Sequence, residues 1–137
     1  MAARARNILV GYDGSEAAQR ALDAAADLVG YGSALSVVTV ATKADDEPAD
    51  NGGSAGRDRA REVVSEARAL LLRRHVTARY LEPVGDPAEM LMETAREVDA
   101  DLIVVGRRDR NPLRRIVLGS VSAKILRHAE CDVLVVS

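Results

Sequence analysis

A turn of small residues, Gly119-Ser120-Val121-Ser122, is well suited to binding an anion. We expect a helix to begin there, so its first backbone N–H groups lack partners and the positive end of its dipole faces outward. The hydroxyls of Ser120 and Ser122 add two donors, and Gly106, which lacks a Cβ, would let the backbone approach a phosphate closely. The local sequence is equally compatible with a structural alternative, in which Ser120 caps the helix and Gly106 turns the chain.

The segment between these two turns is rich in arginine. Residues 107–115 contain five arginines and one aspartate, a local charge of +4 in a chain whose formal net charge is -2. Arginine attracts polyanions and binds phosphate bidentately, so this segment, which begins with Arg107, fits a phosphate site. The alternative is a solvated loop without a ligand, since the chain has 17 arginines and only two lysines.

Asp13 directly follows the first apolar run of the chain. At the carboxyl end of a strand, an aspartate would face a ligand and could hydrogen-bond a ribose or approach a bound Mg²⁺. An Asx-turn, or a cap for the following helix, is an equally suitable role for the same residue. The sequence does not identify a set of metal ligands.

Several kinds of chemistry are disfavoured by what the sequence lacks. It contains no G-x-x-x-x-G-K-[ST] motif and no G-x-G-x-x-G after the first apolar run, so neither a P-loop nor a dinucleotide fingerprint is present. A phospho-accepting receiver domain would need a lysine after the fifth strand, where this chain ends at Ser137. His128 and Cys131 have no third group to orient them, so we assign both structural roles. We therefore expect no catalytic residues and at most slow hydrolysis of a bound nucleotide.

These residues must be positioned by alternating strands and helices. Continuous apolar or β-branched runs predict five strands, at residues 7–12, 35–40, 76–81, 102–105 and 133–136. Helical spacing predicts four helices, beginning at Ser15, around residue 60, at Asp86 and near Val121. The acidic, glycine-containing stretch 42–56 has nothing to bury and is interpreted as a mobile loop.

This order of elements predicts an α/β fold. We expect residues 1–137 to form a single doubly wound, flavodoxin- or Rossmann-like domain with a five-stranded parallel sheet in the order 3-2-1-4-5. In such sheets ligands bind beyond the carboxyl ends of the strands, where the strand order reverses. The turns after the first and fourth strands are therefore the predicted site.

Composition limits the partners and the compartment. With 137 residues, 47% of them hydrophobic, the chain can bury a self-sufficient core, and its single cysteine forms no internal disulfide. Three tyrosines, with no phenylalanine or tryptophan, offer almost no stacking surface, which disfavours nucleic-acid binding. No window approaches the ~18 apolar residues of a membrane-spanning helix, and the first ten residues lack a signal-peptide core. We therefore expect a cytoplasmic protein with no membrane association.

The segments ILVGYDGSEAAQRAL and DLIVVGRRDRNPLRRIVLGSVSAKILRHAECDVLVVS, with the spacing between them, resemble the universal stress protein family over essentially the whole chain. Members of its ATP-binding branch carry G-x-x-G, nine residues, and then G-[ST]. Gly106 and Gly119-Ser120 match the outer elements of this pattern with the correct spacing, while Asp109 replaces the second glycine.

The resemblance implies that the glycine turns surround the phosphates of ATP. The sequence leaves ADP, AMP or a cyclic nucleotide open as alternative ligands, and Mg²⁺ could accompany the nucleotide. The contacts carried over from the resemblance, together with Arg107 from the charged segment, are Asp13, Val40, Gly106, Arg107, Gly119, Ser120, Val121 and Ser122. A carboxylate at Asp109 would repel phosphates unless Mg²⁺ or an arginine lay between them. The resemblance also implies a homodimer formed through the last strand, Val133 to Val136.

Two hypotheses follow from different functional classes. In the first, the protein is a nucleotide-binding regulator in which bound ATP orders residues 107–118 and so presents a surface to an unidentified protein partner. In the second, Asp109 marks the loss of nucleotide binding, and the protein is a nucleotide-independent dimeric interaction module. Its apolar last strand would then be the surface of interest, because an unpaired apolar edge strand favours association.

Overall fold

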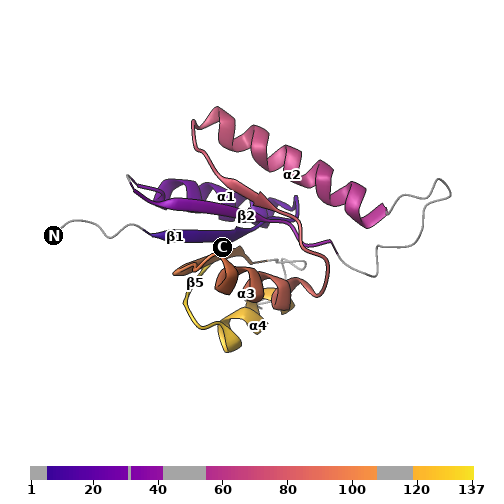
Figure 1. The fold of residues 1–137 in the computed structure, drawn as a ribbon, viewed down its shortest axis with the longest axis vertical. Coiled ribbons are helices and arrows are strands. Elements are labelled where there is room, and N and C mark those ends of the chain that lie inside the picture. Colours follow the sequence, from indigo (N-terminus) through magenta and orange to yellow (C-terminus); the bar gives the residue numbers. More distant parts are fainter. Residues whose placement is uncertain (1–5, 31, 42–54, 108–118) are drawn as a thin grey trace.

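The computed structural model describes residues 6–30, 32–41, 55–107 and 119–137 (Figure 1). Nine helices and strands alternate along these residues: β1 (Asn7–Gly11), α1 (Glu16–Leu28), β2 (Ala34–Val38), α2 (Ala55–Arg73), β3 (Arg79–Leu81), α3 (Pro87–Glu97), β4 (Leu102–Gly106), α4 (Ser120–His128) and β5 (Asp132–Val136). The strands form one parallel sheet in the order β3-β2-β1-β4-β5, which confirms the predicted topology.

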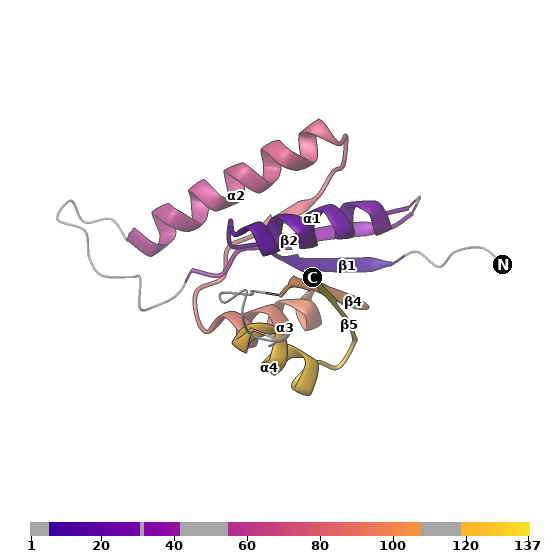
Figure 2. The same cartoon turned by 180° about the vertical axis from the view of Figure 1, so that it is seen from behind.

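The central strands β1 and β4 are buried because helices cover both faces of the sheet. Helices α1 and α2 lie on one face and α3 and α4 on the other (Figures 1 and 2). Successive residues of β1 alternate between these faces: Ile8 and Val10 pack with α1 and α2, and Leu9 packs with α3 and α4. This arrangement accounts for the continuous apolar runs, since a parallel strand covered on both faces has no solvent-exposed side.

Local capping begins two of the helices, as the sequence predicts. The Ser15 hydroxyl accepts a hydrogen bond from the N–H of Ala18 and starts α1, and the Asp86 carboxylate accepts from the N–H of Glu89 and starts α3. The Glu89 carboxylate in the first turn of α3 accepts a hydrogen bond from Lys124 on α4, so this turn also contacts a second helix.

Two predicted boundaries differ most from the structure, beside shifts of one or two residues such as the end of β2 at Val38 in place of Val40. The third strand was expected over residues 76–81 but covers only Arg79–Leu81, because the N–H of Val76 bonds to the carbonyl of Leu71 and closes the end of α2. Ala55 and Gly56 were assigned to a loop but are helical. Gly56 is buried and lies one turn before the buried Ala60, so the apolar stripe of α2 extends back to it. The rest of the predicted loop, residues 42–54, lies outside the described residues.

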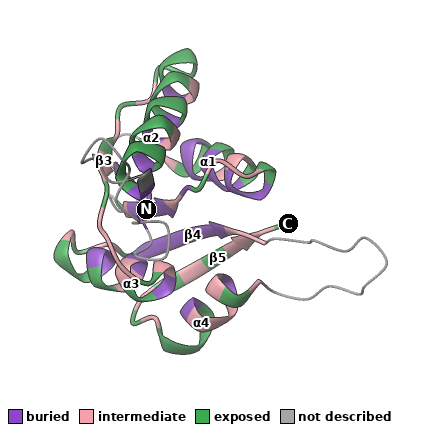
Figure 3. Cartoon of the chain, turned by 90° about the vertical axis from the view of Figure 1, so that its right-hand side faces the viewer, coloured by how far each residue is buried: buried purple, intermediate pink, exposed green. Residues whose placement is uncertain are grey.

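The fifth strand forms one edge of the sheet, and it is less buried than β4 beside it (Figure 3). Leu134 in the middle of β5 is 37% exposed, whereas the adjacent Val104 of β4 is fully buried. An apolar strand therefore lies at the edge of the sheet, as the second hypothesis requires. Among the described residues, no helix is long and apolar enough to cross a membrane.

Candidate functional site

The predicted contacts meet at the end of the sheet formed by the carboxyl ends of its strands. Because all five strands are parallel, the turns that follow β1, β2 and β4 lie at this same end, which holds Asp13, Val40 and Arg107. Helix α4 leads back to the start of the parallel strand β5, so its first residue, Ser120, also lies at the carboxyl end of the strands. β1 and β4 are neighbours, and the strand order changes direction between them, as ligand sites in such sheets require.

The turn after β1 is held by local hydrogen bonds. The Asp13 carboxylate accepts a hydrogen bond from the N–H of Ser15 at 3.0 Å, which is the Asx-turn considered from the sequence. Between them, Gly14 has a φ of 83°, in the left-handed region that favours glycine. Asp13 is exposed, so the Asx-turn leaves its side chain accessible at the carboxyl end of the strands.

Gly106 has a packing role that sequence reasoning missed. A Cβ atom at this position would lie 2.2 Å from the carbonyl oxygen of Ala17 and 2.4 Å from its carbonyl carbon. Both are backbone atoms of α1, so they cannot move aside as the end of a flexible side chain would. The close packing of α1 on the end of β4 therefore requires glycine here, whether or not a phosphate also approaches it.

The N-cap residue of α4 provides no side-chain cap. It is Gly119, with φ -61° and ψ 157°, which has no side chain to accept a hydrogen bond from the helix N–H groups. Ser120 is the first helical residue and is exposed, so the structural alternative in which Ser120 caps the helix is wrong. The first turn also contains no acidic residue, and its N–H groups keep the partial positive charge that attracts anions.

The two serines of this turn differ in their accessibility. The Ser122 hydroxyl is buried and donates a hydrogen bond to the carbonyl of Gly119 at 3.0 Å. Val121 is partly buried and packs against the core on the α3 and α4 face. Ser120 is therefore the predicted hydroxyl donor that lies on the surface.

The remaining predicted contacts continue the sheet beyond its strands. The N–H of Arg107 donates a hydrogen bond to the carbonyl of Val136 at 2.8 Å, and this bond extends the pairing of β4 with β5. Val40 is partly buried against the α3 and α4 face, and an isolated bridge between Ala41 and Val84 holds the adjoining backbone. Asp109 and the arginines after Arg107 in the basic segment lie outside the described residues.

Lys124 links the N-terminal halves of α3 and α4. Its ammonium group lies 3.3 Å from a carboxylate oxygen of Asp86 and 3.3 Å from one of Glu89. These groups are all exposed, so the pairs contribute little stability but align the two helices near the predicted site. No spacing rule in the sequence could have found this contact, because residues 86 and 124 belong to different helices.

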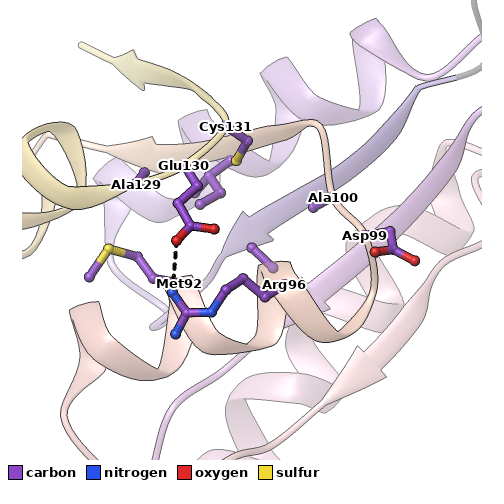
Figure 4. Close-up of a pocket in the computed structure, with 9 residues that line it drawn as sticks. Met92, Arg96, Asp99, Ala100, Ala129, Glu130 and Cys131 are labelled. Carbon is purple, nitrogen blue, oxygen red and sulfur yellow. Dashed lines mark ion pairs between the residues drawn. The ribbon is translucent and has the colours of Figure 1, made fainter.

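A separate hollow of about 420 Å³ lies at the opposite end of the sheet, where the strands begin. It is lined by the end of α3, the start of β4 and the link from α4 to β5 (Figure 4). Arg96 and Glu130 form an ion pair there at 4.0 Å. Burial, and then the charge of Asp132, raise the pKa of the Cys131 thiol, so this cysteine is not an activated nucleophile. Among the described residues, no group of three or more metal-ligating side chains could hold a metal ion.

Comparisons with known proteins give consistent matches. A model described as "Universal stress protein family" matches residues 4–137. The chain is 37% identical over 136 residues to a universal stress protein of Thermus aquaticus, and the match covers 96% of this chain and 98% of that one. It is 40% identical over 79 residues to the stress response protein NhaX of Bacillus subtilis. That match covers 58% of this chain but only 48% of NhaX, and a shorter match covers 34% of a universal stress protein of Synechocystis.

Solved structures show the same architecture over nearly the full chain. A universal stress protein in complex with cAMP is 30% identical, with a TM-score of 0.76 and coverage of 96% of this chain and 97% of that one. A family member from Burkholderia pseudomallei is 33% identical, with a TM-score of 0.73 and coverage of 96% and 95%. The fold and the sequence comparisons thus lead to one family.

Proposed function

The chain belongs to the universal stress protein family, and from this premise we propose that it binds an adenine nucleotide at the carboxyl ends of β1 and β4. The observation that carries the proposal is the uncapped first turn of α4, where Gly119 offers no side chain to the helix N–H groups. Phosphate oxygens would accept hydrogen bonds from these groups and be stabilised by the helix dipole. The exposed hydroxyl of Ser120 would supply one more donor.

ATP is the proposed ligand, with ADP and AMP as alternatives. The similar protein that was solved with cAMP supports an adenine nucleotide, because cAMP combines adenine, ribose and phosphate. In our proposal Val40 lies near the adenine, Asp13 near the ribose, and the backbone of Gly106 and the side chain of Arg107 near the phosphates. The exposed carboxylate of Asp13 could also approach a Mg²⁺ ion that accompanies ATP.

The proposed role is regulation in the cytoplasm during stress. At the carboxyl end of the strands, the described residues near Asp13 and Ser120 do not supply a nucleophile paired with a base. Any hydrolysis of ATP would therefore be slow. Bound nucleotide would order residues 107–118, which connect β4 to α4, and present them to a protein partner. This switch would use nucleotide as a signal.

Thermal unfolding followed by circular dichroism tests nucleotide binding, since the chain contains no tryptophan for fluorescence. A ligand at ~100 times its Kd adds roughly 2.7 kcal/mol to the free energy of unfolding. We therefore expect Mg-ATP to raise the Tm by several degrees and inorganic phosphate at the same concentration to leave it unchanged. The protein must first be shown free of co-purified nucleotide by its absorbance spectrum. Equal midpoints with ATP, ADP, AMP, cAMP and buffer would contradict the proposal.

A second candidate function is a nucleotide-independent dimeric module that associates through the apolar edge strand β5, although a dimer by itself does not separate it from the first candidate. Residues Val133 to Val136 would pair with a second copy, because an unpaired apolar edge favours association. Asp109→Gly separates the two functions, since it restores the glycine of the ATP-binding pattern. Tight ATP binding that appears only in this variant would favour the second candidate, and equal binding by both proteins would favour the first.

Dimerisation itself is tested by sedimentation equilibrium. We expect the unmodified chain to sediment as a homodimer and Leu134→Lys to shift it toward the monomer, since lysine on an edge strand opposes pairing. Leu72→Lys is a matched control, because Leu72 is 66% exposed on α2, away from β5. A monomeric unmodified chain, or equal dissociation by both substitutions, would count against an interface at β5.

A further inference from the structure

A hydrogen-bonded cluster joins α2 to the turn that carries Asp13. One oxygen of the Glu66 carboxylate, Oε1, accepts a hydrogen bond from the hydroxyl of Tyr12 at 2.8 Å. The same oxygen accepts a second bond from the side-chain amide of Gln19 at 3.2 Å. Glu66 lies on α2, Tyr12 follows β1, and Gln19 lies in α1, so one carboxylate connects three segments of the chain.

Tyr12 is the buried member of this cluster, and hydrogen bonds hold both its backbone and its side chain. The residue is 2% exposed and packs in the core beneath α1 and α2. Its N–H donates to the carbonyl of Val38 at 2.9 Å, and its carbonyl accepts from the hydroxyl of Thr39 at 2.8 Å. With the bond to Glu66, three polar groups of Tyr12 are held by three different residues. The backbone that leads into Asp13 therefore has a defined direction.

Glu66 holds the turn on both of its sides. Tyr12 precedes the turn and Gln19 follows it, so the two side chains that donate to Glu66 flank Asp13, Gly14 and Ser15. The turn also lies against α2, since a Cβ at Gly14 would be 3.6 Å from a methyl carbon of Val63 and 3.8 Å from Oε2 of Glu66. Helix α2 runs along the same face of the sheet as α1 (Figure 2).

We infer that Glu66 is a positioning residue of the nucleotide site: through Tyr12 and Gln19 it holds the turn that presents Asp13 to the ribose. The inference rests on the proposed function. Glu66 itself does not contact the ligand in this scheme. Its removal leaves Tyr12 without its acceptor on α2, and Asp13 must then be ordered when the nucleotide binds, which weakens binding.

The test compares three variants by equilibrium dialysis with radiolabelled ATP. Glu66→Ala removes the acceptor, and we expect it to raise the Kd roughly threefold to tenfold. Glu66→Gln keeps an amide oxygen for both donors, so we expect its Kd to stay within about twofold of the unmodified protein. Arg74→Ala is the stability control, because Arg74, in the turn directly after α2, forms ion pairs with Asp23 and Asp27 and so joins the end of α2 to α1, away from the turn that carries Asp13. We expect it to leave the Kd unchanged.

A second readout does not depend on nucleotide. In ¹H–¹⁵N spectra of the free protein, we expect Glu66→Ala to shift or broaden the amide signals of Gly14 and Ser15, and Arg74→Ala to leave them in place. Unchanged Kd and unchanged turn signals in Glu66→Ala would overturn the positioning role, as would an equal loss of affinity in Arg74→Ala. If the unmodified protein binds no adenine nucleotide, the proposed function fails first and the positioning role fails with it.

Discussion

The carbonyl oxygen of Ala17 lies so close to Gly106 that a Cβ atom added to the glycine would stand 2.2 Å from it. This contact seats the first turn of α1 on the carboxyl end of β4. It therefore joins the two turns on which the proposed site depends, the turn after β1 and the turn after β4. A glycine that matches a phosphate-binding pattern thus also allows α1 to pack closely on β4 beside the proposed site.

Gly106→Ala should destabilise the fold, because its new methyl group would meet backbone atoms of α1. Overpacking of this kind costs roughly 1–3 kcal/mol, so we expect a lower midpoint in urea unfolding. Gly30→Ala is the matched control, since a Cβ there meets no atom within 4 Å. Its midpoint should stay the same or rise slightly, because alanine restricts the unfolded chain. Equal midpoints for the two variants would show that α1 does not pack on Gly106 as described.

Ser120→Ala and Ser122→Ala should separate binding from stability. Ser120 is exposed at the start of α4, so its loss should weaken ATP binding severalfold and change the free energy of unfolding by less than about 0.5 kcal/mol. Ser122 is buried and donates to Gly119, so its loss should cost about 1 kcal/mol of stability. Isothermal titration with ATP and urea unfolding measure the two effects. The same response from both serines would argue against their different placement.

The Asp86 cap should give the stability a measurable dependence on acid. The N–H of Glu89, and then the ammonium of Lys124, hold the pKa of the Asp86 carboxyl below its usual value of 3.8. Because the folded-state pKa is the lower one, this stabilisation is present above about pH 4 and is lost as the pH falls below that value. Asp86→Asn keeps a good capping residue without the charge, so it should be slightly less stable than the unmodified chain at pH 6.

Urea midpoints measured from pH 6 down to pH 3 test this dependence. The difference between Asp86→Asn and the unmodified chain should shrink as the Asp86 carboxyl becomes protonated. Asp58→Asn offers a control, since Asp58 is exposed in the first turn of α2. A difference that stays constant over the whole range would mean that the charge of Asp86 does not contribute to stability.

Tyr12 should remain protonated in alkaline solution. Burial, and then the hydrogen bond to Glu66, raise the pKa of its phenol well above the ordinary value of 10.0. Since the folded-state pKa is raised, this contribution to stability is present below pH 10 and is lost at higher pH. Absorbance at 295 nm should show Tyr12 ionising only as the protein unfolds, and Tyr12→Phe should lack that last step. Ionisation of Tyr12 together with exposed tyrosines would contradict the buried cluster.

Elements that depend on local sequence were predicted well. The apolar run Leu102 to Val105 is a buried strand, and Ser15 and Asp86 cap their helices as their types and positions indicate. The strand order was also predicted correctly. The short edge strand β3 was predicted too long, because the N–H of Val76 is taken up by the end of α2, a contact that no run of β-branched residues can show.

By itself, the sequence determined the order of strands and helices and the parallel sheet. It also determined that Asp13, Gly106 and Ser120 lie at the carboxyl end of the strands. These follow from hydrophobic periodicity and capping, which act over a few residues. Only the tertiary structure decided that Gly106 is required by Ala17, that the Ser122 hydroxyl points inward and that Glu66 holds the turn beside Asp13. The long-range contacts join segments tens of residues apart, and a hydroxyl's direction depends on packing, so neither can be inferred from neighbours along the chain.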